Sequence, residues 1–161
     1  TEEKKAEWGL PVKLVELEEL LAQSDFISVH VPLIDQTRDL IDEAELSQMK
    51  SDAILINASR GGVVNENALI KALENNRIAG AGLDVFLEEP VPADNPLLNL
   101  DNVILTPHTA ALTSECVIRM ATEAAKCVID VFAGREPQNV ANPQVLESGR
   151  WKSHRTVETT V

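Results

Sequence analysis

The sequence predicts an α/β fold in which a parallel sheet is flanked by helices. Helical stretches alternate with short apolar runs along the chain. The apolar runs are continuous, which is typical of parallel strands that are buried on both faces. The chain has 161 residues and is 44% hydrophobic, which is enough for one domain with a substantial core.

The first half of the chain predicts two helices and two strands. Residues 14–23 have leucines at helical spacing, and residues 25–32 (DFISVHVP) form a short apolar run. Residues 42–50 predict a helix that Asp42 and Glu45 open with a capping box. Residues 52–59 (DAILINAS) predict a second, buried strand.

The second half repeats this alternation. Residues 65–77 predict a helix with Asn65 as its N-cap. Strands are expected at residues 78–86 (IAGAGLDVF) and 102–108 (NVILTPH). The longest helix is expected at residues 113–134, from Thr113 to Gly134. From Glu147 the sequence is polar and aperiodic, and we expect a loose extension there.

Composition excludes several classes of partner. The net charge is −12 without a basic cluster, so neither nucleic acid nor an anionic membrane surface is an expected partner. No apolar run approaches the roughly 20 residues of a membrane span, and the first ten residues lack a signal-peptide pattern.

The two cysteines predict no disulfide and no metal site. Cys116 and Cys127 lie in one predicted helix, eleven residues and roughly 16 Å apart, which is too far for a bridge. Neither has a histidine at metal-ligand spacing. We therefore expect packing cysteines in a reducing, cytoplasmic compartment.

Polar residues follow the apolar runs, where parallel strands would bring them to one edge of the sheet. This set contains a cation, two histidines and several carboxylates: His30, Arg60, Asp84, Glu88, Glu89 and His108. We expect these groups to surround a single crevice.

Arg60 has two interpretations. Its guanidinium forms a two-pronged donor that matches a ligand carboxylate. Alternatively, it is a surface arginine paired with a neighbour such as Glu66. The Gly61–Gly62 pair favours the functional interpretation, because it lets the backbone turn sharply and approach a ligand.

Glu89 and His108 are expected to pair if their strands are adjacent. A histidine oriented by a carboxylate can give a proton to a carbonyl or take one from a hydroxyl. The alternative is a histidine that is merely satisfied at a strand end. His30 lines a pocket or bonds to backbone, and Asp84 needs either a backbone partner or the amide of a ligand.

The chain contains no GxGxxG motif. GAG at residues 80–82 lies in an expected strand and leads into LDVF rather than into a helix. By that motif alone, a nucleotide site is not supported.

Four long blocks nevertheless resemble the D-isomer-specific 2-hydroxyacid dehydrogenases, which include D-3-phosphoglycerate dehydrogenase and glyoxylate and hydroxypyruvate reductases. The blocks are DFISVHVPLIDQTRDLID, MKSDAILINASRGGVVNENALIKAL, IAGAGLDVFLEEPVPADNPLLNLDNVILTPHTAA and GREPQNVANPQVL, which cover most of residues 17–146. The resemblance implies a Rossmann-like sheet and hydride transfer between NAD or NADP and a small 2-oxo or 2-hydroxy acid.

The resemblance also implies residue roles. Arg60 would bind the substrate carboxylate, His108 would be the proton donor and acceptor, and Glu89, directly before the proline, would support His108. Asp84 would accept a hydrogen bond from the nicotinamide carboxamide. The implied cofactor contacts are His30, Val31, Pro32, Thr37, Ala58, Ser59, Arg60, Asp84 and His108.

The chain departs from the family in length, since a family chain is about twice as long. It resembles the C-terminal half, without the first βαβ unit of the cofactor domain. We expect residues 1–135 to be a partial NAD(P)-binding domain and residues 136–161 to return toward a substrate domain. A homo-oligomer, or association with a missing N-terminal part, is expected. A dinucleotide-sensing corepressor-like module and an inactive fragment remain alternatives.

Overall fold

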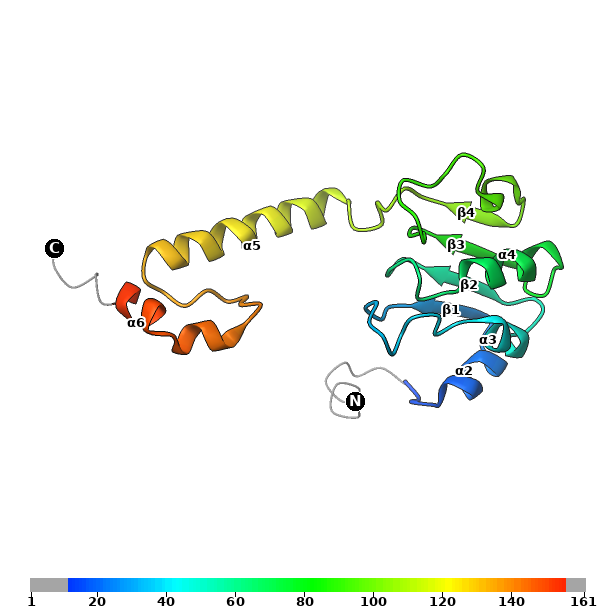
Figure 1. Cartoon of the computed structure of the whole chain (residues 1–161), viewed down its shortest axis with the longest axis horizontal. Helices are drawn as coiled ribbons and strands as arrows, with labels where there is room; N and C mark the ends of the chain where they lie inside the picture. The colour runs from blue at the N-terminus through cyan, green and yellow to red at the C-terminus, as the bar shows by residue number, and fades with distance from the viewer. Residues whose placement is uncertain (1–11, 156–161) are drawn as a thin grey trace. The chain divides into compact units, whose positions relative to one another are not determined.

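The computed structural model describes residues 12–155 and divides into two units, Thr1–Ala110 and Ala111–Val161 (Figure 1). The first unit contains a four-stranded sheet in the order β1-β2-β3-β4, in which every pair of neighbours is parallel. The strands are β1 (Phe26–Val29), β2 (Ile54–Asn57), β3 (Gly80–Leu83) and β4 (Val103–Leu105). The predicted parallel α/β fold is therefore confirmed.

The strand register aligns the carboxyl ends of all four strands. Val29 pairs with Asn57, Asn57 with Leu83, and Leu83 with Leu105. The residues that directly follow the four strands therefore all lie at the same edge of the sheet. This row is the structural reason why polar residues from distant parts of the sequence can form one site.

Three helices of this unit connect or precede the strands: α2 (Leu17–Gln23), α3 (Glu43–Gln48) and α4 (Glu66–Glu74). The predicted capping box is present, with Asp42 N donating to Glu45 Oε2 at 3.0 Å. Asn65 caps α4, accepting from Ala68 N at 3.0 Å. A short 3₁₀ helix, η1 (Pro96–Asn99), replaces a helix between β3 and β4.

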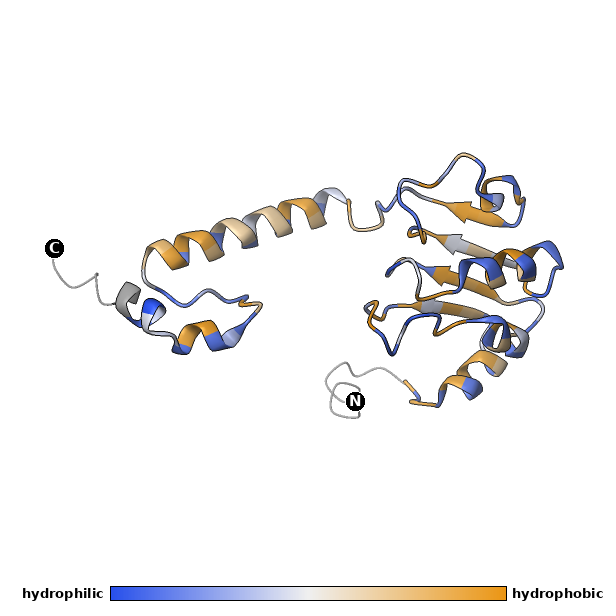
Figure 2. Cartoon of the chain, in the orientation of Figure 1, coloured by the Kyte–Doolittle hydropathy of each residue, from blue (hydrophilic) through white to orange (hydrophobic). Residues whose placement is uncertain are grey.

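The strands are largely hydrophobic (Figure 2), and the buried residues Ile27, Leu55 and Ala81 pair in register, so they lie on one face of the sheet. Ile27 and Val29 are buried, whereas Phe26 is 70% exposed and Ile104 is 75% exposed. The expectation that both faces are buried is therefore wrong for the described part of this unit. The strand order never reverses, so right-handed crossovers place the connecting helices α3 and α4 on the same face.

The second unit contains α5 (Ser114–Phe132), η2 (Pro143–Glu147) and α6 (Gly149–Arg155). Thr113 Oγ1 accepts from Cys116 N at 3.2 Å, and Gly134 follows α5 with φ of 67°, as predicted for its two ends. Both cysteines are free. Within the described residues, no helix is both long and apolar enough to span a membrane.

The expectation of a loose extension after Glu147 is wrong for residues 149–155, which form helix α6. This helix has no apolar periodicity in the sequence, which is why the pattern missed it. Ser148 provides a local start signal, because its Oγ accepts from Trp151 N at 3.3 Å. Residues 156–161 of the extension lie outside the described residues.

Candidate active site

The residues after β2, β3 and β4 are held together by backbone hydrogen bonds just beyond the strands. Asp84 N donates to Asn57 O and Thr106 N donates to Leu83 O, each at 2.9 Å. The sheet ladder therefore continues by one residue at its carboxyl edge. Side chains carried by the following turns are attached to a rigid base.

Glu89 and His108 form a direct pair at this edge. His108 Nδ1 lies 2.8 Å from Glu89 Oε2, while Phe86 N donates to Glu89 Oε1 at 3.0 Å. Glu88, the neighbouring carboxylate, does not make this contact. The expected pairing across the two strands is present, and it leaves Nε2 of His108 available to another group.

The environment keeps Glu89 ionised. The hydrogen bond from His108, followed by that from the Phe86 amide, lowers the pKa of Glu89 despite some desolvation. Its side chain is 36% exposed and that of His108 is 49% exposed. The pair therefore lies open to a ligand at the surface of the unit.

His108 has a backbone conformation that non-glycine residues rarely adopt. Its φ is 54°, and its amide donates to Thr106 O at 3.0 Å in a tight turn. Histidine is among the residues enriched in this left-handed region, although it still costs roughly 1–2 kcal/mol. Such conformations concentrate at functional sites.

Asp84 fixes the turn that carries His108. Oδ1 accepts from Thr106 Oγ1 at 2.5 Å and from Thr109 N at 2.8 Å, and Oδ2 accepts from Ala110 N at 2.9 Å. Asp84 is only 5% exposed. Burial raises its pKa, but these hydrogen bonds and the His108 charge together lower it, so the carboxylate stays ionised.

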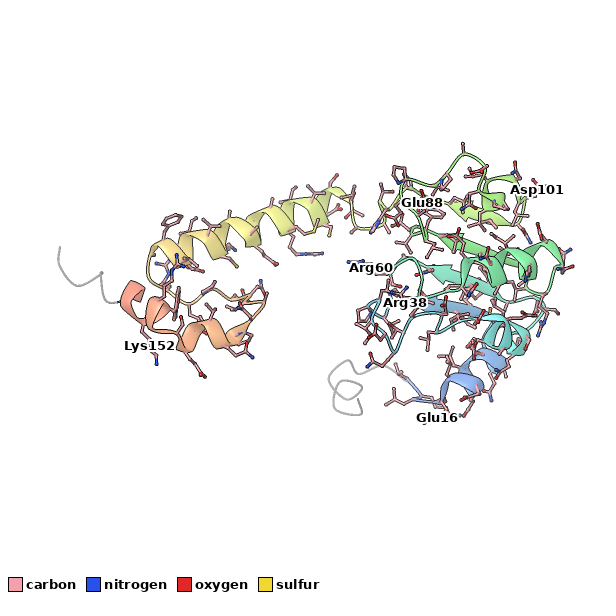
Figure 3. All side chains as sticks on the ribbon, in the orientation of Figure 1. Glu16, Arg38, Arg60, Glu88, Asp101 and Lys152 are labelled. Carbon is pink, nitrogen blue, oxygen red and sulfur yellow. The ribbon has the colours of Figure 1, made fainter. Side chains whose placement is uncertain are left out.

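Arg60 projects from the turn after β2 and is exposed. Nη1 donates to its neighbour Ser59 O at 2.6 Å, and no carboxylate of the described residues pairs with it. Glu66 instead accepts from Leu87 N and Asn95 Nδ2, and the alternative Arg60–Glu66 pair is not formed. Figure 3 places Arg60 and Arg38 at the edge toward which the strands point, opposite Asp101.

Asn57 is a site-forming residue that sequence reasoning missed. It is 3% exposed, and its side chain forms hydrogen bonds with the turn that carries Arg60. Oδ1 accepts from Ser59 N at 3.1 Å and Ser59 Oγ at 2.8 Å, and Nδ2 donates to Arg60 O at 3.1 Å. The signal in the sequence is an amide at the last position of an otherwise apolar strand.

Gly61 brings the Arg60 turn against the turn that carries Glu89. A Cβ at Gly61 would lie 1.7 Å from Phe86 O and 2.3 Å from Phe86 C. No side chain fits in that space. Gly61 therefore serves contact between two protein turns, and Gly62, with a φ of 78°, allows the sharp turn that the sequence predicted.

The residues predicted after β1 form a separate loop at the same edge. His30 Nε2 lies 2.8 Å from Ser28 Oγ. Thr37 Oγ1 donates to Pro32 O at 2.5 Å and accepts from Ile34 N at 2.9 Å. Thr37 thus organises this loop, and Val31 within it is half-buried.

A cavity of about 600 Å³ opens beside the pair. Its lining is mostly apolar and includes both members of the pair: Phe86, Glu89, Pro90, Val91, Leu98, Leu105, Thr106, Pro107 and His108. An apolar wall beside a histidine–carboxylate pair limits the access of water to that pair. Arg60 does not contribute to this wall.

Comparison with known proteins identifies relatives of this arrangement. A family model described as "D-isomer specific 2-hydroxyacid dehydrogenase, NAD binding domain" matches residues 1–110. Glyoxylate reductase from Korarchaeum cryptofilum is 50% identical over 138 residues, which are 86% of this chain and 42% of the relative. The chain thus spans about two fifths of the length of that relative.

Two solved structures are similar in fold and sequence. D-lactate dehydrogenase with NAD⁺ from Lactobacillus jensenii matches with a TM-score of 0.75 and 36% identity, over 80% of this chain and 42% of that one. A D-isomer specific 2-hydroxyacid dehydrogenase from Xanthobacter autotrophicus Py2, in complex with NADPH and MES, matches with a TM-score of 0.68 and 37% identity, over 80% and 52%.

Proposed function

This chain belongs to the D-isomer specific 2-hydroxyacid dehydrogenase family, and from this premise we propose that it forms part of an enzyme that reduces a 2-oxo acid with NAD(P)H. The single observation that carries the proposal is the His108–Glu89 pair, 2.8 Å apart, at the carboxyl edge of the sheet. Arg60, which has no carboxylate partner in residues 12–155, follows β2, the neighbour of the strand that precedes Glu89.

The proposed roles follow from the chemistry of each group. Arg60 binds the substrate carboxylate with its two-pronged guanidinium. His108 donates the proton on Nε2 to the carbonyl oxygen while a hydride adds to the carbonyl carbon, so that the C=O group becomes CH–OH. Glu89 holds the ring by Nδ1 and so orients Nε2 toward the substrate. In the reverse direction, His108 accepts the hydroxyl proton.

The residues present fit the nicotinamide end of a dinucleotide. Asp84 is an ionised carboxylate with three protein donors, and a carboxylate can accept about four hydrogen bonds. Its remaining lone pair on Oδ2 suits a carboxamide N–H. The dinucleotide would supply the hydride, with contacts from Asp84, His108 and the residues of the first two strand ends: His30, Val31, Pro32, Thr37, Ala58, Ser59 and Arg60.

The substrate is proposed as a small 2-oxo or 2-hydroxy acid, in agreement with the glyoxylate reductase relative. We propose a cytoplasmic enzyme that assembles as a homo-oligomer or with a further polypeptide segment. Residues 136–161 are proposed to return toward a substrate domain. Without a GxGxxG loop, the chain by itself is proposed to bind NADH weakly and to be inactive.

The test is an assay of the parent enzyme, meaning a protein that combines this chain with the remaining three fifths of the family length. NADH or NADPH oxidation is measured with glyoxylate and with hydroxypyruvate, alongside the isolated chain. Substrate-dependent turnover by the parent supports the proposal. Tight NADH binding without turnover on either acid would instead favour a dinucleotide-sensing module.

A further inference from the structure

Glu66 is the first residue of helix α4, and its carboxylate forms hydrogen bonds with a segment outside the helix. Oε2 accepts from Leu87 N at 2.9 Å, and Oε1 accepts from Asn95 Nδ2 at 2.9 Å. These partners lie 21 and 29 residues further along the chain. Leu87 and Asn95 enclose the segment that contains Glu89. One carboxylate therefore fastens both ends of the segment to the start of α4.

The peptide group between Phe86 and Leu87 is the centre of these contacts. Its N–H donates to Glu66, and Gly61 lies against its carbonyl, with a Cβ position only 1.7 Å from the oxygen. The preceding amide, Phe86 N, donates to Glu89. Two successive amides are thus held by two different carboxylates. Phe86 therefore contacts the Arg60 turn through its carbonyl and, through its amide, the residue that orients His108.

Asn95 gives the contact a defined orientation. Its Oδ1 accepts from Leu97 N at 3.0 Å as the cap of η1, so its Nδ2 must face Glu66. Leu97 is almost fully buried, which fixes η1 in the core. Glu66 is half-buried. Its two bonds are charge-assisted and partly shielded from water, which makes them stronger than bonds between neutral groups.

We propose that Glu66 is a positioning residue of the active site: by holding the Phe86–Leu87 peptide and Asn95, it sets Glu89 against His108 and fixes their spacing from Arg60. The inference rests on the proposed function for its catalytic consequence. The contacts by which Glu66 positions Glu89 involve only residues of this chain.

The test compares Glu66→Gln with Glu74→Gln, an exposed glutamate at the far end of α4. In Glu66→Gln, the new Nε2 opposes either the Leu87 amide or the Asn95 amide, so one bond is lost. NMR titration of the Glu89 carboxyl carbon in the chain should show its pKa rising toward the ordinary range, since its own bonds to Phe86 N and His108 loosen. Glu74→Gln should leave the titration unchanged.

A rescue variant separates positioning from general destabilisation. In the double variant Glu66→Gln with Asn95→Asp, the new glutamine accepts from Leu87 N and donates to the new aspartate, which still caps η1. The parental Glu89 titration should return. In the parent enzyme, kcat should fall about 10-fold or more in the single variant, since small displacements of reacting groups are costly, and recover in the double variant.

The proposal is overturned if Glu89 titrates in Glu66→Gln as it does in Glu74→Gln, whether or not the melting temperature falls. It is also overturned if the double variant fails to restore the titration while remaining folded by circular dichroism. Neither result depends on turnover. Absence of 2-oxo acid reduction by the unmutated parent enzyme, with the titration shifted as expected, would contradict the proposed function and leave the positioning role of Glu66 standing.

Discussion

Gly61 lies so close to the backbone of Phe86 that a Cβ on the glycine would be 1.7 Å from the Phe86 carbonyl oxygen. The contact joins two turns that follow different strands. One turn carries Arg60, and the other carries Glu89, whose carboxylate accepts from Phe86 N. This backbone contact places the turn that carries Arg60 directly against the turn that carries Glu89.

The first prediction concerns this contact. Gly61→Ala should lower the free energy of unfolding by about 1–3 kcal/mol, because the added methyl group overlaps backbone atoms that have no room to yield. Chemical denaturation of the chain measures this. Gly149→Ala is the control, since nothing lies within 4 Å of its Cβ position. Equal stability of the two variants would contradict the close contact.

The second prediction concerns Asp84. In Asp84→Asn, Oδ1 can keep Thr106 and Thr109, but the new amide opposes Ala110 N. Leaving a buried donor unpaired should cost about 1–3 kcal/mol of unfolding free energy. Asp101→Asn, an exposed aspartate at the opposite edge (Figure 3), should stay within about 0.5 kcal/mol. If Asp84→Asn left the unfolding free energy unchanged, the turn that carries His108 would be held by other contacts.

Much of the fold follows from the sequence because its signals are local. The capping box at Asp42 and the end of α5 at Gly134 depend on residues within a few positions, and both are present. The alternation of apolar runs with helices also suffices to predict parallel pairing. The exposed face with Phe26 and Ile104 was not predicted, because an apolar run does not say on which face its helices lie.

A site residue was predictable where it ends or follows an apolar run of the sequence. His108, Glu89 and Arg60 each end or follow an apolar run, so their position at one edge follows from strand order. Asn57 bonds to residues two and three positions away, and its amide at the end of an apolar strand is a local signal, whereas Glu66 acts through partners that no local pattern reveals. The partners of Glu66 are 21 and 29 residues away, and only the folded chain brings them together.

The third prediction concerns acid stability. The pKa of Glu89 is lowered in the fold by its bonds to His108 and Phe86 N. Its contribution to stability is therefore present above the ordinary value of about 4.5 and is lost as the pH falls through the lower, folded pKa. Glu89→Gln removes this contribution at every pH. Its unfolding free energy should decline less steeply in acid than that of the parental chain.

The matched control for this variant is Glu88→Gln, the neighbouring exposed glutamate (Figure 3). Its stability should follow the parental curve as the pH is lowered. Urea denaturation at a series of pH values between about 6 and 3 records all three curves. Parallel curves for Glu89→Gln and the parental chain would count against an ionised, hydrogen-bonded Glu89.

The fourth prediction concerns Arg60 in the parent enzyme. Arg60→Ala should raise the KM for the 2-oxo acid by about 10- to 100-fold, as expected for loss of charged hydrogen bonds, and should lower kcat as well. Arg60→Lys should recover only part of this, because an ammonium group lacks the planar fork. Arg38→Lys tests the other arginine at this edge and should change KM little. A similar effect at both positions would indicate general attraction of the acid rather than a specific contact.

The central claim is that His108, oriented by Glu89, exchanges the proton with the substrate oxygen. The most direct measurement is the kcat for NAD(P)H-dependent reduction of glyoxylate or hydroxypyruvate by the parent enzyme with His108→Asn, with His154→Asn as the control. The account predicts that kcat falls by about 10²- to 10⁴-fold in the first variant and is unchanged in the second. Near-normal turnover by a folded His108→Asn enzyme would contradict the account, because the proton would then come from another group.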